Sequence, residues 1–314
     1  MTRLLLLLPF LALACDDTVA GNNDVLRFRY DADDNFLPSA FNTPIGAGLA
    51  ARVEVFFDPD GDGSAAEVEA PVIDAASSDA SIVAVVATTG NTLTLLAKAA
   101  GSAEIRVQTS RGEDVFDARV VDVAKIDISH PGVLVSDSPP SKGMVGGTAR
   151  FIIALKTSSN QPAVGFGQFE ATVAPLGALQ LLESEDVGFA PVRFGVAGTA
   201  TLTGLGDEPL TVEVVADADV TTLEMIGPGT VTELVAGREL AAILRGRTAA
   251  GDKVVGVASL ATVASSDPSV CTITPNQKLG EGAYLIVAKA AGTCRVSATL
   301  GARAVQHDIA VTAK

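Results

Sequence analysis

The 314-residue sequence has no tryptophan, two tyrosines, two histidines and an aromatic content of 4%. We therefore expect thin cores built mainly from Val, Ala, Leu and Ile. Basic residues are also scarce: 22 Lys and Arg stand against 37 Asp and Glu, for a net charge of −15. A chain of this charge is repelled by phosphates, which argues against nucleic acid as a partner. Beyond the first 15 residues, no apolar run is long enough to span a bilayer.

The usual marks of an enzyme are missing as well. There is no Gly-x-Ser-x-Gly sequence and no Cys–His pair suited to nucleophilic catalysis. His130 and His307 have no metal-ligand partner at helical spacing, and the glycines at Gly204 and Gly206 lack the third glycine of a dinucleotide site. We expect a protein that is not an enzyme and carries no cofactor, with calcium as the one open alternative.

The first fifteen residues have the pattern of an export signal. One positive charge precedes the apolar run Leu4–Leu13, and small residues precede Cys15. The segment resembles a bacterial lipoprotein signal with its lipobox, which implies lipidation at Cys15 and attachment to a membrane through the N-terminal lipid. The resemblance implies a location in the bacterial cell envelope, on the outer membrane or cell surface. Asp16 resembles an inner-membrane retention signal, so the periplasmic face of the inner membrane stays open, as does an ordinary secretory signal.

The chain repeats itself with the period of a small domain. The sequence of Ala97–Ser102 returns at Ala288–Thr293, with a fainter copy at Ala197–Thr199. The glycines of these copies, at 101, 198 and 292, lie 97 and 94 residues apart, and each leads into an alternating apolar and polar run. Such alternation is typical of strands with one buried face. The period predicts three domains, each with room for one two-sheet core.

Two further landmarks recur within the repeats. Gly48, Gly147 and Gly237 each precede an early strand, and a Ser-Ser-Asp-x-Ser turn occurs at 77–81 and 265–269. Together with the Ala-Gly-Ser/Thr turn, these motifs resemble the bacterial immunoglobulin-like domain of group 2, found in invasin- and intimin-like surface proteins.

The resemblance implies an all-β fold of three tandem immunoglobulin-like β-sandwich domains after the signal segment. We assign residues 1–15 to the signal, 16–24 to an acidic tether, and 25–124, 125–217 and 218–314 to the three domains; the middle one matches least well. The joints at 123–126 and 215–218 are short and lack the composition of a flexible linker. This favours a string of end-to-end sandwiches, on the order of 100 Å long.

Residues 58–69 satisfy the spacing of a calcium-binding loop. The ligands would be Asp58, Asp60, Asp62, Ser64 and Glu69, because alternating carboxylates let one tight turn aim several oxygens at one point. The flanking residues are typical of strands rather than helices, and Asp-Gly is also an ordinary hairpin turn. Calcium binding and a plain hairpin are therefore both open.

Cys271 and Cys294 form an even pair once Cys15 is set aside. In the aligned repeats they fall on Val83 and Ala103, which are inward-facing strand positions. An oxidising envelope compartment favours a disulfide between them; two buried free thiols are the alternative.

These features predict a lipid-anchored envelope protein that acts as a noncatalytic adhesion, spacer or interaction module. Its protein or glycan ligand is not identified by the sequence. One alternative is a calcium- or carbohydrate-binding surface protein that recognises its ligand through the first domain. Another is a noncatalytic subunit of a larger envelope complex.

Overall fold

A computed structural model describes residues 19–31, 41–57, 59, 68–131, 142–276 and 280–314. Its regular structure is β throughout, apart from two single 3-10 turns at Asp217–Asp219 and Val257–Ser259. No helix in this part of the chain has the length and apolar character needed to cross a membrane. The predicted fold class, all-β with tandem immunoglobulin-like sandwiches, is confirmed.

The first sandwich packs two antiparallel-rich sheets face to face. One sheet has the order β1-β2-β4-β8-β7 with β5 beside β4, and the other has the order β3-β10-β9-β6. Its strands are β1 (Val19–Ala20), β2 (Leu26–Tyr30), β3 (Ile45–Gly46), β4 (Ala50–Phe57), β5 (Val68–Glu69), β6 (Val72–Ser77), β7 (Val83–Thr89), β8 (Thr92–Ala97), β9 (Gly101–Thr109) and β10 (Gly112–Val121).

The second sandwich pairs the sheet β11-β13-β17-β16, with β14 beside β13, against the strands β15-β18-β19-β12. These strands are β11 (Lys125–Ser129), β12 (Lys142–Met144), β13 (Thr148–Lys156), β14 (Pro162–Ala163), β15 (Ala171–Ala174), β16 (Leu179–Leu181), β17 (Phe189–Phe194), β18 (Gly198–Gly204) and β19 (Leu210–Val215).

The third sandwich pairs the strands β23-β22-β26-β25, with β20 beside β22, against the sheet β21-β28-β27-β24. These strands are β20 (Val220–Ile226), β21 (Glu233–Val235), β22 (Glu239–Thr248), β23 (Lys253–Val255), β24 (Thr262–Ser265), β25 (Cys271–Pro275), β26 (Ala283–Ala288), β27 (Gly292–Leu300) and β28 (Arg303–Thr312).

The buried residues fall into three clusters, one for each sandwich, and most of them are aliphatic. The alternation that the sequence shows is the alternation of burial: along β9, every second residue from Ala103 to Thr109 is buried. In the third sandwich, Cys271 of β25 and Cys294 of β27 form a disulfide between the two sheets, with their Cα atoms 5.6 Å apart. Both cysteines are buried, as are Val83 and Ala103 at the aligned positions.

The repeated motifs have repeated geometry. In the first and third sandwiches, the carboxylate of Asp79 or Asp267 accepts the backbone N–H and the hydroxyl of the serine two residues later. Gly147 directly precedes β13, as predicted, but the residue with the turn conformation of Gly48 and Gly237 is its neighbour Gly146. Gly146 has a φ of +81°, as does Gly48, and Gly237 has +85°.

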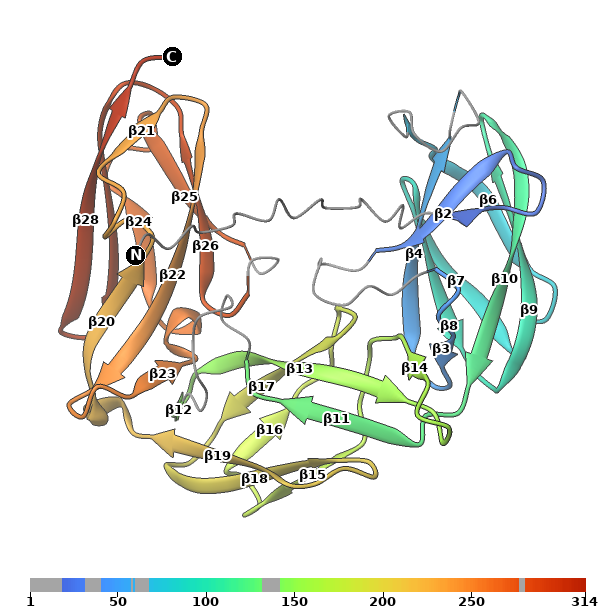
Figure 1. Cartoon of the computed structure of the whole chain (residues 1–314), viewed down its shortest axis with the longest axis horizontal. Coiled ribbons are helices and arrows are strands. Elements are labelled where there is room, and N and C mark those ends of the chain that lie inside the picture. Colours follow the sequence, from blue (N-terminus) through green and yellow to red (C-terminus); the bar gives the residue numbers. More distant parts are fainter. Residues whose placement is uncertain (1–18, 32–40, 58, 60–67, 132–141, 277–279) are drawn as a thin grey trace, which may run out of the picture.

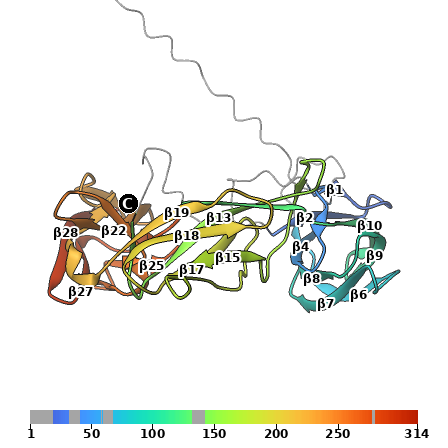
Figure 2. The ribbon, with the colours of Figure 1, turned by 90° about the horizontal axis from the view of Figure 1, so that it is seen from below.

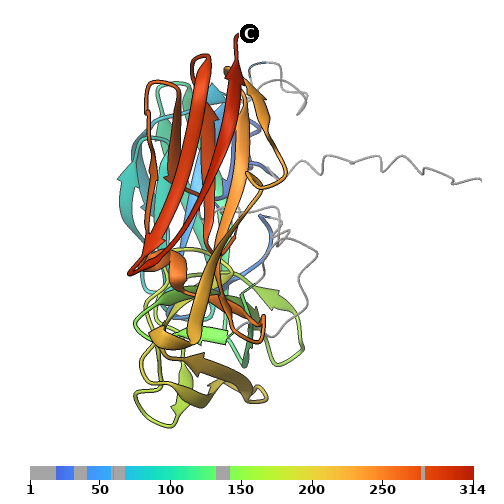
Figure 3. The same cartoon turned by 90° about the vertical axis from the view of Figure 1, so that its left-hand side faces the viewer.

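The three sandwiches form a U rather than the end-to-end string that the short joints favoured (Figure 1). The first and third sandwiches extend to the same side of the second (Figure 3), and all three lie side by side in one layer (Figure 2). The U shape arises because the second sandwich contacts the first and third sandwiches through its sides as well as through the short connecting segments.

Candidate functional site: the joints and the concave cleft

The first joint lies between the first and second sandwiches. It combines backbone β-bridges with apolar side chains that each sandwich places in the core of the other. Ile45 and Ala50 of the first sandwich form β-bridges with Val164 and Phe166 of the second. Leu49, in the turn between β3 and β4, packs into the core of the second sandwich and is 6% exposed. In the opposite direction, Val164 and Val187 belong to the core of the first sandwich. Each sandwich therefore contributes apolar side chains to the core of the other at this joint.

The second joint is a continuous sheet. The short strand β12 runs parallel to β19 of the second sandwich and to β23 of the third, which joins their strands into one sheet of nine. The ammonium group of Lys142, on β12, lies 2.7 Å from a carboxylate oxygen of Glu213 and 2.9 Å from one of Asp252. Hydrogen bonds to these two carboxylates raise the pKa of Lys142.

A close backbone approach completes the second joint. A Cβ atom on Gly147 would lie 2.5 Å from the carbonyl oxygen of Gly256, so only glycine fits there. The next residue, Thr148, donates its backbone N–H to the hydroxyl oxygen of Ser259 at 2.9 Å. These contacts bring β13 of the second sandwich against the 3-10 turn of the third.

A cleft of about 450 Å³ lies between the second and third sandwiches. Its walls come from β13 and β17, from residues 183–186 before β17, and from the turns that flank β23 and β26 of the third sandwich. The lining is formed by Thr148, Ala149, Arg150, Glu183, Ser184, Glu185, Asp186, Phe189, Pro191, Ala258, Ser259, Pro275, Gly280, Glu281, Gly282, Ala283 and Tyr284.

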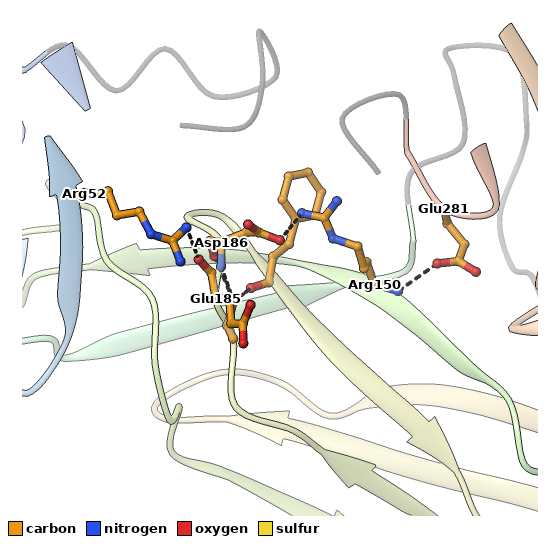
Figure 4. Close-up of polar contacts among 7 residues, drawn as sticks. Arg52, Arg150, Glu185, Asp186 and Glu281 are labelled. Carbon is orange, nitrogen blue, oxygen red and sulfur yellow. Dashed lines mark hydrogen bonds and ion pairs between the residues drawn. The ribbon is translucent and has the colours of Figure 1, made fainter. Parts of the chain in front are cut away.

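The loop of residues 182–188, between β16 and β17, is held by hydrogen bonds from the side chain of Ser184 to backbone carbonyl groups. This serine is 2% exposed, and its hydroxyl oxygen lies 2.8 Å and 2.5 Å from the carbonyl oxygens of Asp186 and Phe189. The first sandwich holds the same loop: Arg52 on β4 donates to the carbonyl oxygen of Glu185 at 2.9 Å (Figure 4). Its guanidinium group also lies over the ring of Phe166, 4.8 Å from the centroid.

Arg150, on β13, ties the loop to the second sandwich. Its guanidinium group lies 2.9 Å from a carboxylate oxygen of Asp186 and 4.4 Å from the ring centroid of Phe189. The side chain of Arg150 is 11% exposed, so this ion pair is largely shielded from water. The loop thus contacts β4 of the first sandwich through Arg52 and β13 of its own sandwich through Arg150.

Glu281 connects the third sandwich to the second through hydrogen bonds of its carboxyl group. One carboxylate oxygen accepts the backbone N–H of Arg150 at 3.0 Å (Figure 4), and the other accepts the N–H of Gly256 at 3.4 Å. Burial raises the pKa of the Glu281 carboxyl to about 7, against the opposing effect of these two N–H groups and the charge of Arg150. Beside it, burial and the charge of Glu281 raise the pKa of Tyr284.

Among the described residues, four carboxyl side chains and one guanidinium group line the cleft. Among the described residues that line the cleft there is no histidine or cysteine, and the hydroxyl of the buried Ser184 is bonded to backbone carbonyls. The described part of the chain holds no group of three or more His, Cys, Asp or Glu side chains placed to bind a metal ion. Exposed carboxylates of Glu183 and Glu185 and the ring of Phe189 leave an acidic, partly apolar surface.

Most residues of the predicted sites lie outside the described residues. This applies to Cys15 and, in the calcium loop, to Asp58, Asp60, Asp62 and Ser64. Glu69 is described: it is exposed and pairs with Phe56 across β4 and β5. Lipidation and calcium binding stay predictions; a calcium-dependent rise in Tm that is lost in Asp58→Asn would support calcium binding.

The repeated motifs of the sequence do not predict the joints or the cleft. The segment from Ala163 to Gly188 is longer and less regular than its counterparts in the other repeats. That segment contains Val164 and Phe166, which bind the first sandwich, and the loop at 182–188. A departure from the repeat was therefore the available signal for an inter-domain contact.

No protein-family model and no curated protein matches the sequence. Among solved structures, domains 4–9 of the surface layer protein SbsC match at 14% identity over 95% of this chain, with a TM-score of 0.30; this chain spans about half (46%) of that fragment. FdeC, an Escherichia coli adhesin, matches at 12% identity over 86% of this chain and 94% of its own, with a TM-score of 0.26. Invasin, a bacterial integrin-binding protein, matches at 12% identity over 87% of this chain and 59% of its own, with a TM-score of 0.24.

Proposed function

We propose that this chain is a noncatalytic envelope protein, anchored through lipid on Cys15, that acts as a rigid interaction module. Its three sandwiches hold a concave, acidic face in a fixed shape for a partner outside the cytoplasm. The observation that carries the proposal is the construction of the two joints. Apolar side chains from each of the first two sandwiches lie in the core of the other, and a continuous sheet joins the second and third.

Rigid joints favour a role in presentation or spacing. A protein whose surface is already in its binding shape loses less conformational entropy when a partner binds. Interfaces between domains of one chain are usually small and polar, and they allow the domains to move relative to each other. Here Leu49 and Val164 bury apolar side chains in the neighbouring core, and β12 hydrogen-bonds on both sides. A flexible tether between domains would not need these contacts. They suit a binding surface that must keep its shape.

Anchoring is tested by cell fractionation. The wild-type protein is expected in the membrane fraction, and Cys15→Ala is expected in the soluble fraction because it has no acceptor for the lipid. Metabolic labelling with a fatty-acid analogue should mark the wild type alone. Membrane association of the Cys15→Ala protein would contradict the lipid anchor.

The interaction face is tested by photo-crosslinking in intact cells. A crosslinking residue at Glu183, in the cleft, is expected to capture a partner as a discrete adduct. The matched control is Leu176, which is 96% exposed and does not line the cleft. Equal adducts at both positions, or none at Glu183, would contradict the proposal. Stoichiometric co-purification of the partner in mild detergent would identify the protein as a subunit of a complex instead.

A further inference from the structure

One wall of the cleft is held by a sandwich that contributes none of the described lining residues. Those residues all belong to the second and third sandwiches. Residues 183–186, in the loop between β16 and β17, form part of the wall, yet Arg52 of the first sandwich donates to the carbonyl oxygen of Glu185 at 2.9 Å. We propose that the first sandwich sets the shape of the cleft through this loop, with Arg52 as a positioning residue.

Arg52 is itself held in place at the first joint. It lies on β4, opposite Thr94 of β8, and its guanidinium group lies 4.8 Å from the ring centroid of Phe166 in the second sandwich. Phe166 is fixed as well, because its backbone N–H and carbonyl groups both bond to Ala50, at 2.9 Å each. A stacked guanidinium group presents its N–H donors in a fixed direction, so less entropy is lost when one of them binds the loop.

A second contact draws the same loop toward the first sandwich. Val187, two residues after Glu185, is 7% exposed and packs in the core of the first sandwich. Burial of an apolar side chain has no directional preference, whereas a hydrogen bond fixes the carbonyl group that accepts it. Val187 therefore holds the loop close to the first sandwich, and Arg52 determines how the loop is oriented there.

The second sandwich holds the loop from the other side. The guanidinium group of Arg150, on β13, lies 2.9 Å from a carboxylate oxygen of Asp186. Figure 4 shows Arg52 and Arg150 approaching the loop from opposite sides. Residues 185, 186 and 187 thus contact the first, second and first sandwich in turn. Since Glu183 and Glu185 line the cleft, release of the loop on one side should displace part of the cleft wall.

The test is a distance distribution between spin labels at Glu183, in the loop, and Thr274, on β25 of the third sandwich, both exposed. The full-length protein is studied without a partner, in a Cys15→Ser background where the remaining cysteines form the disulfide. The wild type should give one narrow distance. Arg52→Ala should broaden the distribution, because Glu185 then has no donor from the first sandwich.

A second pair of labels separates movement of the loop from movement of the joint. Gln180 and Thr299 are exposed residues of the second and third sandwiches, outside the cleft. Their distance should stay narrow in Arg52→Ala, because β12 still pairs with β19 and β23.

Arg29→Ala is the matched control for the loss of an arginine from the same sheet. Arg29 lies on β2, pairs with Glu54 at 2.6 Å and lies 4.4 Å from the ring centroid of Phe56. These partners all belong to the first sandwich. Arg29→Ala should therefore leave the distance between Glu183 and Thr274 narrow.

Amide hydrogen exchange gives a readout without labels. The amide of Ser184 bonds to the carbonyl oxygen of Gly167 at 2.9 Å, so it reports opening of the loop. Its protection should fall by about tenfold in Arg52→Ala, the factor expected for the loss of one hydrogen bond to a charged group. The amide of Gly195 is the reference, because it bonds to the carbonyl oxygen of Ala178 elsewhere in the second sandwich.

Val187→Ala removes the apolar contact of the loop and should also broaden the distance between Glu183 and Thr274. The proposal is overturned if Arg52→Ala leaves either this distance or the protection of Ser184 unchanged. It is also overturned if Arg29→Ala has the same effect, if the distance between Gln180 and Thr299 broadens, or if the wild type already gives a broad distance across the cleft. Because no partner is present, none of these results bears on the interaction proposed above.

Discussion

Leu49→Ala should loosen the first joint while leaving both neighbouring sandwiches folded. Leu49 belongs to the turn between β3 and β4 of the first sandwich, yet its side chain packs in the core of the second and is 6% exposed. Truncation of a buried leucine to alanine costs 2–5 kcal/mol in general, so we expect a loss of about 3 kcal/mol. Almost all of this loss should fall on the contact between the sandwiches, because the strands on either side keep their own partners.

The assay is a distance distribution between spin labels at Gln108 and Gln180, both exposed, one on each side of the joint. The labels are placed in a Cys15→Ser background, where the remaining cysteines form the disulfide. The wild type should give one narrow distance, and Leu49→Ala a broad distribution. Leu95→Ala is the matched control: Leu95 is fully buried in the first core alone. It should lower the Tm and keep the narrow distance.

The reasoning is refuted if Leu49→Ala loses stability but keeps the narrow distance. That result would mean that the bridges of Ile45 and Ala50 to the second sandwich fix the joint without the side chain. It is refuted as well if Leu95→Ala broadens the distance as much as Leu49→Ala, because the joint would then follow the stability of the first sandwich in general.

Three further outcomes are expected. The buried carboxylate of Asp114 accepts the N–H groups of residues 23, 25, 26 and 115 at 2.8–2.9 Å, so Asp114→Asn should leave buried donors unpaired and cost at least about 2 kcal/mol, measured by denaturant unfolding. Removal of the disulfide by Cys271→Ala with Cys294→Ala should lower the stability of the third sandwich by about 3 kcal/mol, seen as a lower Tm that no longer responds to reducing agent. Burial lowers the pKa of His130 below its ordinary 6.5. The contribution of neutral His130 to the free energy of unfolding is therefore complete above pH 6.5 and is lost as the pH falls through the lowered pKa. His130→Gln should reduce this loss of stability at acid pH, measured by unfolding at several pH values.

The repeating parts of the fold follow from the sequence because they depend on local chemistry. A Ser-Asp turn forms through hydrogen bonds to its own backbone, so residues 77–81 and 265–269 reveal it without tertiary context. The glycines Gly101 and Gly292 are required because Ile82 and Val270 pack directly against them. These contacts recur at the same spacing, and an internal repeat makes such positions visible.

The shape of the molecule could not be predicted in the same way. The joints depend on contacts between residues more than 100 positions apart, such as Arg52 with Glu185 and Thr148 with Ser259. No local pattern marks these partners. The role of Gly147 could not be predicted for the same reason: its neighbour Gly146 supplies the turn, and Gly147 is needed because the backbone of Gly256 lies against it.

The cleft was hidden for a related reason. Glu281 stands between two glycines in what the sequence presents as an ordinary turn, and its carboxyl acquires a raised pKa only through burial against the second sandwich. The segment of residues 163–188 departs from the repeat, but such a departure gives a location and not a contact. Long-range packing determined both the site and its titration behaviour.

The three sandwiches form one fixed U, and a distance across its opening tests this most directly. Spin labels at Gln108 in the first sandwich and Thr299 in the third, both exposed, report on the two joints at once. We expect a single narrow distance that agrees with the U of Figure 1. A broad distribution, or a distance that fits only an extended row of sandwiches, would contradict the account.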